Sequence, residues 1–209
     1  MKNLTQIRLQ LARFPDDVWL WMLASQWQRI AQEEAFVGQT IEAGDELGSR
    51  LVYGRLALEL MRLRFLLHRT YWPYTKWFGS AFGRLPDASL LGDSLVAMLS
   101  AKAGDLAQSA LAASLEIAAR KHNELAITDH VDPSVRNFHS RPFQVLQAER
   151  FVDACLLQVG DLRLRDAPLI GSIDQWVDST DVLENPDRTS LTGTVYGWTP
   201  TTEEIRPAL

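Results

Sequence analysis

Cysteine is almost absent from this sequence, since Cys155 is the only one among 209 residues. A single cysteine excludes an internal disulfide, and its place in the apolar run 152–157 predicts a buried thiol. Long hydrophobic runs are missing too, because none approaches the roughly 20 residues that a membrane-spanning helix needs. Charged and amide residues interrupt the first eight positions, which is unlike a signal peptide. These absences predict a cytoplasmic protein that does not enter a membrane.

Acidic residues are scarce between residues 50 and 84. This stretch carries seven arginine and lysine residues against one acid, Glu59, whereas residues 151–209 carry ten acids against four bases. The formal net charge of the whole chain is −5, which argues against a general nucleic-acid binder. The basic stretch is compatible with a small phosphorylated ligand, and equally with a helix that faces the acidic C-terminal region or solvent.

Signals for β-structure are also few, and no hairpin pattern or internal repeat is present. Apolar residues recur instead at helical spacing, which predicts helices at about 3–12, 15–37, 45–68, 75–84, 88–100, 102–127 and 147–159, and a short one at 170–177. Segment 45–68 has two apolar stripes, one of them starting with Leu47 and Leu51, as in the central helix of a bundle. We therefore predict an all-α fold, with a helical bundle of about six to eight helices over residues 1–183. A loosely structured tail is expected over 184–209.

The densest chemical feature is the block 71–86, which begins Tyr71-Trp72-Pro73-Tyr74-Thr75-Lys76-Trp77. Lys76 is expected near the start of a helix, where an ammonium beside free backbone N–H groups suits a phosphate. The rings of Trp72, Tyr74 and Trp77 would stack on a base or a sugar. Arg84 adds a second cation to this predicted ligand site. The alternative is that the rings belong to the core and Lys76 extends to water.

Other candidate residues lie in two places. Glu33 and Glu34 end the second expected helix, where a carboxylate serves as a base, a metal ligand or an ordinary surface partner of a cation. His139 and Arg141 lie in a polar loop expected at 128–142, where they are available to a ligand or to loop packing. His122 ends an apolar stripe, which is typical of a histidine at the edge of a bundle.

Two further patterns compete with this interpretation. Arg62 and His68 have the arginine-x5-histidine spacing of HEPN ribonucleases, but six residues turn a helix by roughly 600°, so their side chains do not share a face. Residues 171–181 superficially resemble the Gly-Ser and Asp-x-Asp metal site of polymerase-β-type nucleotidyltransferases. That site needs alternating carboxylates on a strand, which this segment does not offer.

Several longer motifs run through the chain. They are Arg13 to Trp19, Gln26 to Gly38, Asp45 to Ser49 and Trp72 to Pro86, followed by 122–123, 139–146 and 170–183. Together they resemble the C-terminal helical domain of bacterial nucleotidyltransferase-like proteins, known as domain of unknown function 4037. In that family the helical domain normally follows a polymerase-β-type catalytic domain that holds the metal. The resemblance implies that this chain lacks the catalytic half and holds no cofactor itself.

The resemblance also implies what the chain would recognise. With a catalytic nucleotidyltransferase domain as partner in trans, magnesium and a nucleoside triphosphate would be present. Lys76 would then contact phosphate, Glu33 or Glu34 would act as a base or contact the acceptor, and Arg141 would contact an anion. The expected function is a helical ligand-recognition domain that is inactive alone. A protein–protein interaction module without nucleotide binding is the first alternative, and a HEPN-type ribonuclease is the second.

Overall fold

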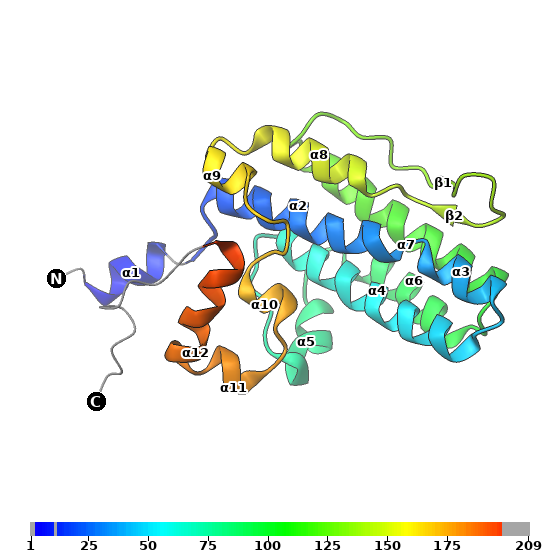
Figure 1. Ribbon diagram of the computed structural model, residues 1–209, viewed down its shortest axis with the longest axis horizontal. Coiled ribbons are helices and arrows are strands. Elements are labelled where there is room, and N and C mark those ends of the chain that lie inside the picture. The colour runs from blue at the N-terminus through cyan, green and yellow to red at the C-terminus, as the bar shows by residue number, and fades with distance from the viewer. Residues whose placement is uncertain (1–2, 11, 198–209) are drawn as a thin grey trace.

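The chain folds almost entirely into α-helices. The computed structural model describes residues 3–10 and 12–197, and within them the all-α prediction is confirmed (Figure 1). The helices of seven residues or more are α1 (Leu4–Gln10), α2 (Asp16–Glu33), α3 (Phe36–Glu42), α4 (Glu46–Leu67), α5 (Thr75–Phe82), α6 (Ala88–Ser100), α7 (Asp105–Glu124) and α8 (Glu149–Gln158).

The long helices form a bundle around one core. α2 packs against α4 and α8, α4 also packs against α3, α6 and α7, and α6 packs against α7. Trp27 of α2 is fully buried and stacks on Phe151 of α8 with ring centroids 4.5 Å apart. Burying such large rings supplies much of the apolar area that holds a domain together.

Helix α4 shows how the sequence pattern becomes packing. It begins after Asp45, whose carboxylate accepts a hydrogen bond of 2.8 Å from the backbone N–H of Gly48, as an N-cap does. The stripe that includes Leu56 and Leu60 is fully buried, as predicted. The other stripe is not buried at its start, because Leu47 is 71% exposed and Leu51 is 64% exposed. Only the C-terminal two thirds of α4 are therefore central.

A small hairpin between α7 and α8 was not expected. Strands β1 (Arg136–Asn137) and β2 (Gln144–Val145) pair antiparallel, with Arg136 opposite Val145. Phe143 of this hairpin is buried, and its ring stacks on that of Phe138 with centroids 5.4 Å apart. Strands of two residues are too short to show an alternating pattern in a sequence.

The segment after α8 continues as short turns of helix. These are α9 (Leu162–Arg165), α10 (Ile173–Trp176), α11 (Thr180–Leu183), α12 (Pro186–Leu191) and the 3-10 helix η1 (Thr192–Tyr196). Residues 184–197 of the predicted tail hold two of these short turns, α12 and η1. Tyr196 anchors them, because its hydroxyl donates to the carbonyl of Gly171 at 2.7 Å and accepts from Trp176 Nε1 at 2.9 Å. Residues 198–209 of that tail lie outside the described residues.

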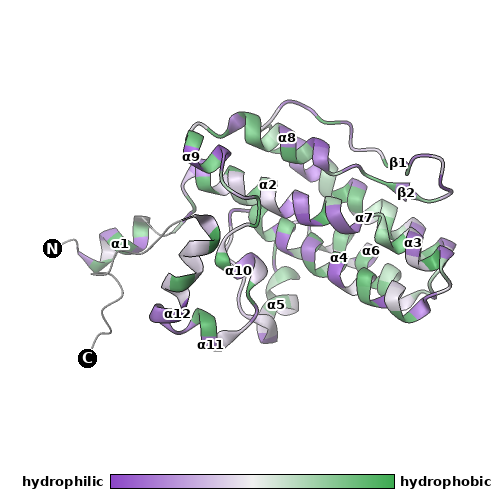
Figure 2. Cartoon of the chain, viewed as in Figure 1, coloured by the Kyte–Doolittle hydropathy of each residue, from purple (hydrophilic) through white to green (hydrophobic). Residues whose placement is uncertain are grey.

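Helix α1 stands apart from the bundle (Figure 1). Its hydrophobic residues are coloured green in Figure 2, and Leu4 and Leu9 are 65% and 71% exposed. Among the described residues, no helix combines the length and the hydropathy that crossing a membrane requires.

Candidate functional site

The aromatic block opens α5 and lies on the surface. Tyr71 is 47% exposed, Tyr74 59% and Trp77 51%, so these rings are not core residues. Lys76 is exposed between them, and its Nζ lies 5.2 Å from the centroid of the Trp77 ring. Among the described residues, no carboxylate pairs with Lys76. We call Tyr71, Tyr74, Lys76 and Trp77 the α5 surface.

The start of α5 adds backbone donors to this surface. Tyr74 occupies the N-cap position and makes no side-chain capping bond. The N–H of Trp77 is satisfied by the carbonyl of Tyr74 at 3.0 Å. Among the described residues, the N–H groups of Thr75 and Lys76 have no acceptor. Free N–H groups at a helix start attract an anion.

Two predicted members of this site lie elsewhere. Trp72 is half-buried against the core, and the guanidinium of Arg62 lies 5.9 Å from its ring centroid. Arg84 is exposed beyond the other end of α5, eight residues from Lys76, which corresponds to about 12 Å along a helix. The ring of Trp72 is thus partly covered by the core, and Arg84 lies beyond the opposite end of α5 from Lys76.

Glu33 and Glu34 end α2 but face different neighbours. Glu33 forms an ion pair with Arg55 of α4, and burial raises its pKa while Arg55 opposes the shift. Glu34 is 4% exposed and accepts hydrogen bonds from the backbone N–H groups of Leu146 at 2.6 Å and Ala148 at 2.9 Å. Burial raises the pKa of Glu34 to about 7. Its carboxylate fixes the connection between β2 and α8.

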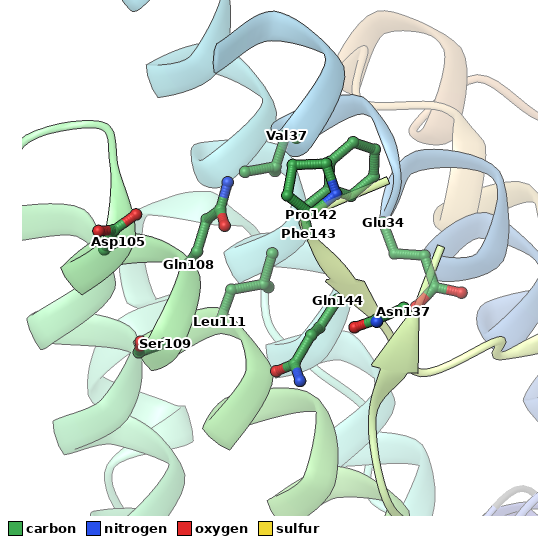
Figure 3. A pocket seen from close by; sticks show the side chains of 11 residues that line it. Glu34, Val37, Asp105, Gln108, Ser109, Leu111, Asn137, Pro142, Phe143 and Gln144 are labelled. Carbon is green, nitrogen blue, oxygen red and sulfur yellow. The ribbon is translucent and has the colours of Figure 1, made fainter. Parts of the chain in front are cut away.

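Two cavities flank Glu34. One, of about 250 Å³, lies between α3, α7 and the hairpin, and the side chains of Gln108, Leu111 and Gln144 line it (Figure 3). The other, of about 270 Å³, is lined by Glu34, His139 and Arg150 among others. Each oxygen of Glu34 already accepts one backbone bond, so about half of the acceptor sites of this carboxylate are used within the fold.

His139 and Arg141 belong to the hairpin turn. His139 is exposed with a φ of 52°, and its ring meets Phe138 edge-on with centroids 4.6 Å apart. Arg141 pairs with Glu42 of α3 at 2.7 Å. Of the nine predicted site residues, Tyr74, Lys76 and Trp77 come together on α5, and Glu34 and His139 share a cavity.

A buried polar network was missed by sequence reasoning. Glu59 of α4 accepts from Gln26 Nε2 at 2.6 Å, from Arg29 Nη2 at 2.8 Å and from Arg62 Nη1 at 3.3 Å. Gln175 of α10 completes the network. Its side-chain Nε2 donates to Gln26 Oε1 at 2.9 Å, and its backbone carbonyl accepts from Arg62. The single acid in the basic stretch was the one available signal.

Of the histidine candidates, His122 is held by hydrogen bonds, whereas the buried Nε2 of His68 has no hydrogen-bond partner among the described residues. Arg62 is held by Glu59, Asp178 and the carbonyl of Gln175, and no hydrogen bond joins it to His68 in the described part of the chain. His122 is fully buried between Trp27 Nε1 at 3.2 Å and the hydroxyl of Thr128 at 3.1 Å, and burial lowers its pKa to about 4.

Residues 171–181 also have a structural role. Ser172 and Gln175 form the capping box of α10, and Asp178 pairs with Arg62 at 3.0 Å. Among the described residues, no group of three or more His, Cys, Asp or Glu side chains is arranged to hold a metal ion.

Comparison with known proteins gives one result. A family model described as a domain of unknown function, DUF4037, matches residues 1–78. The match spans α1 to α4 and the first half of α5, and so includes the α5 surface. Searches of curated proteins and of solved structures found no match. The chain is therefore similar to DUF4037 over its N-terminal part, where the first motifs of the expected resemblance lie.

Proposed function

We propose that this chain is a helical recognition domain that binds a nucleoside triphosphate on the α5 surface, beside a nucleotidyltransferase-like catalytic domain. The similarity to DUF4037 over residues 1–78 supports the resemblance to that family, and the catalytic neighbour is inferred from the resemblance alone. The exposure of Tyr74 and Trp77 around an unpaired Lys76 carries the ligand part. Each large ring left in water forgoes apolar burial, which a stacking ligand would restore.

The chemistry of the α5 surface matches two parts of a nucleotide. Stacking of a base on an exposed ring contributes about 1–3 kcal/mol of binding free energy, whichever base it is. The ammonium of Lys76 and the free N–H groups of Thr75 and Lys76 would receive phosphate oxygens. The metal-binding carboxylates of the transfer reaction would come from the catalytic domain, and the chain alone is expected to show no transferase activity.

A second candidate function rests on a different observation. Leu4 and Leu9 of α1 are exposed apolar residues. Phe14, which follows α1 in sequence, packs against Tyr71 with ring centroids 4.3 Å apart and ring planes tilted by 52°. Apolar residues gathered on a surface mark contacts with another protein. In this alternative the chain is an interaction module whose aromatic surface binds a protein and no nucleotide.

Calorimetric titration with ATP and GTP separates the two functions. The proposal predicts binding that weakens about tenfold or more in Lys76→Met and in Trp77→Ala, because each loses a charge-assisted or stacking contact. Lys102→Met is the matched control, since Lys102 is an exposed cation outside the surface. Absence of heat with every nucleoside triphosphate, in a protein shown to be folded, would leave the interaction module as the better account.

A further inference from the structure

A cavity unrelated to the α5 surface lies between the start of α6, α7 and the C-terminal part of α4. Its volume is about 330 Å³. Arg64 of α4, Ser89 and Leu90 of α6, and Ile117 and Lys121 of α7 line it. This volume lies at the small end of the range for sites that bind small molecules.

Arg64 is a buried cation that forms no ion pair within the described part of the chain. The residue is 3% exposed, and its Nη2 donates to the carbonyls of Pro86 at 3.1 Å and Asp87 at 3.0 Å. Its Nε has no hydrogen-bond partner. No carboxylate of the described residues lies within 4.0 Å of its guanidinium. Because a buried charge is normally paired, a bound anion would stabilise the guanidinium of Arg64.

The start of α6 supplies donors to the same cavity. Helix α6 has 13 residues, and Asp87 at its N-cap has a φ of 55° and makes no side-chain capping bond. Among the described residues, the N–H groups of Ser89 and Leu90 have no acceptor. Unsatisfied N–H groups and the positive end of the helix dipole favour a negative group at this point.

The remaining charges at the cavity are already paired with one another. Lys121 Nζ lies 3.1 Å from Glu124 and 3.7 Å from Asp87. Arg120 pairs with Glu116 at 3.2 Å. Asp87 and Glu124 also line the cavity and attract Arg64 electrostatically, but among the described residues neither forms an ion pair with it.

We propose that this cavity binds the phosphate group of a small phosphorylated molecule. The guanidinium of Arg64 and the N–H groups of Ser89 and Leu90 hold the phosphate oxygens, and Lys121 adds a further cation. The side chains of Leu90 and Ile117 give the organic part an apolar wall. This site does not depend on the α5 surface or on a nucleotide.

The test is a titration followed by ¹H–¹⁵N spectra of the full chain. Inorganic phosphate and phenyl phosphate are the two probes, with sodium chloride at matched ionic strength as the blank. We expect saturable shifts of the Ser89 and Leu90 amide signals with both probes. Tighter binding of phenyl phosphate identifies a phosphate ester as the ligand, and equal binding identifies free phosphate.

Variants assign the effect to the cavity. Ser89→Glu places a carboxylate at the exposed start of α6 and is expected to abolish the saturable shifts, and Lys121→Met should weaken binding about tenfold. Arg64→Lys removes the planar donor fork and should weaken it similarly. Lys102→Met, which changes an exposed cation outside both surfaces, should leave the affinity unchanged. Shifts as large with chloride as with phosphate, or saturation that persists in Ser89→Glu, would overturn the proposal.

Discussion

Replacing Glu59 with glutamine is expected to lower the free energy of unfolding by about 3–5 kcal/mol. The side chain of Glu59 is 5% exposed, and that of Arg62 beside it is 7% exposed. Glutamine keeps the shape but removes the charge, so Arg29 and Arg62 would lose their shared carboxylate. Among the described residues, the remaining charged partner of Arg62 is Asp178, whose side chain is 79% exposed and therefore compensates a buried charge poorly.

Urea unfolding measures this loss. A domain of ordinary stability has about 5–15 kcal/mol in total, so a substantial fraction should disappear. With a slope of about 2 kcal/mol per molar urea, the midpoint should fall by about 2 M. Glu46→Gln is the matched control on the same helix, because Glu46 pairs with Arg50 in solvent and its loss should cost less than about 1 kcal/mol. Equal midpoints for both variants would refute the importance of the buried network.

Two other predictions concern pH and packing. Burial raises the pKa of Glu34 to about 7, so the contribution of Glu34 to stability falls as pH rises from about 4.5 to about 7. Burial lowers the pKa of His122 to about 4, so the contribution of His122 is complete above about pH 6.5 and is lost as pH falls toward 4. We expect urea unfolding at several pH values to show that Glu34→Gln removes a fall of stability with rising pH and that His122→Gln removes a rise. An unchanged dependence of stability on pH in both variants would contradict the burial argument. Gly38→Ala should destabilise by about 1–3 kcal/mol, because an added Cβ would lie 2.1 Å from the ring of Phe143. Gly54→Ala is the control in the same assay, because Gly54 is exposed on α4 and an added Cβ would meet nothing within 4 Å. This control should stabilise the protein by up to about 1 kcal/mol. A similar gain in Gly38→Ala would show that the hairpin does not pack against Gly38.

Local signals predicted the long helices well. The bounds of α4 follow from the cap at Asp45 and from apolar residues at helical spacing, both of which are properties of adjacent residues. The exposure of Leu47 and Leu51 was not predictable, because hydropathy does not say which apolar face finds a partner. The anchoring of residues 184–197 depends on Tyr196 reaching Gly171, a contact between short segments without periodicity.

The candidate sites divide in the same way. Tyr74, Lys76 and Trp77 are neighbours in sequence, so their clustering on α5 could be predicted. The buried network joins Glu59 to Gln175, more than one hundred positions away, and only the folded chain brings them together. The setting of Arg64 could not be predicted either. Whether it forms an ion pair depends on where Asp87 and Glu124 place their carboxylates in the folded chain.

Mapping the contacts of ATP on the chain tests the proposed recognition role most directly. In ¹H–¹⁵N spectra recorded during an ATP titration, we expect saturable shifts of the Tyr74 and Lys76 amides and of the indole N–H of Trp77. Shifts confined to Ser89 and Leu90 would mean that ATP binds through its phosphates in the cavity beside Arg64. The α5 surface would then have another partner. A spectrum that ATP leaves unchanged at Tyr74, Lys76 and Trp77 would contradict nucleotide recognition by this surface.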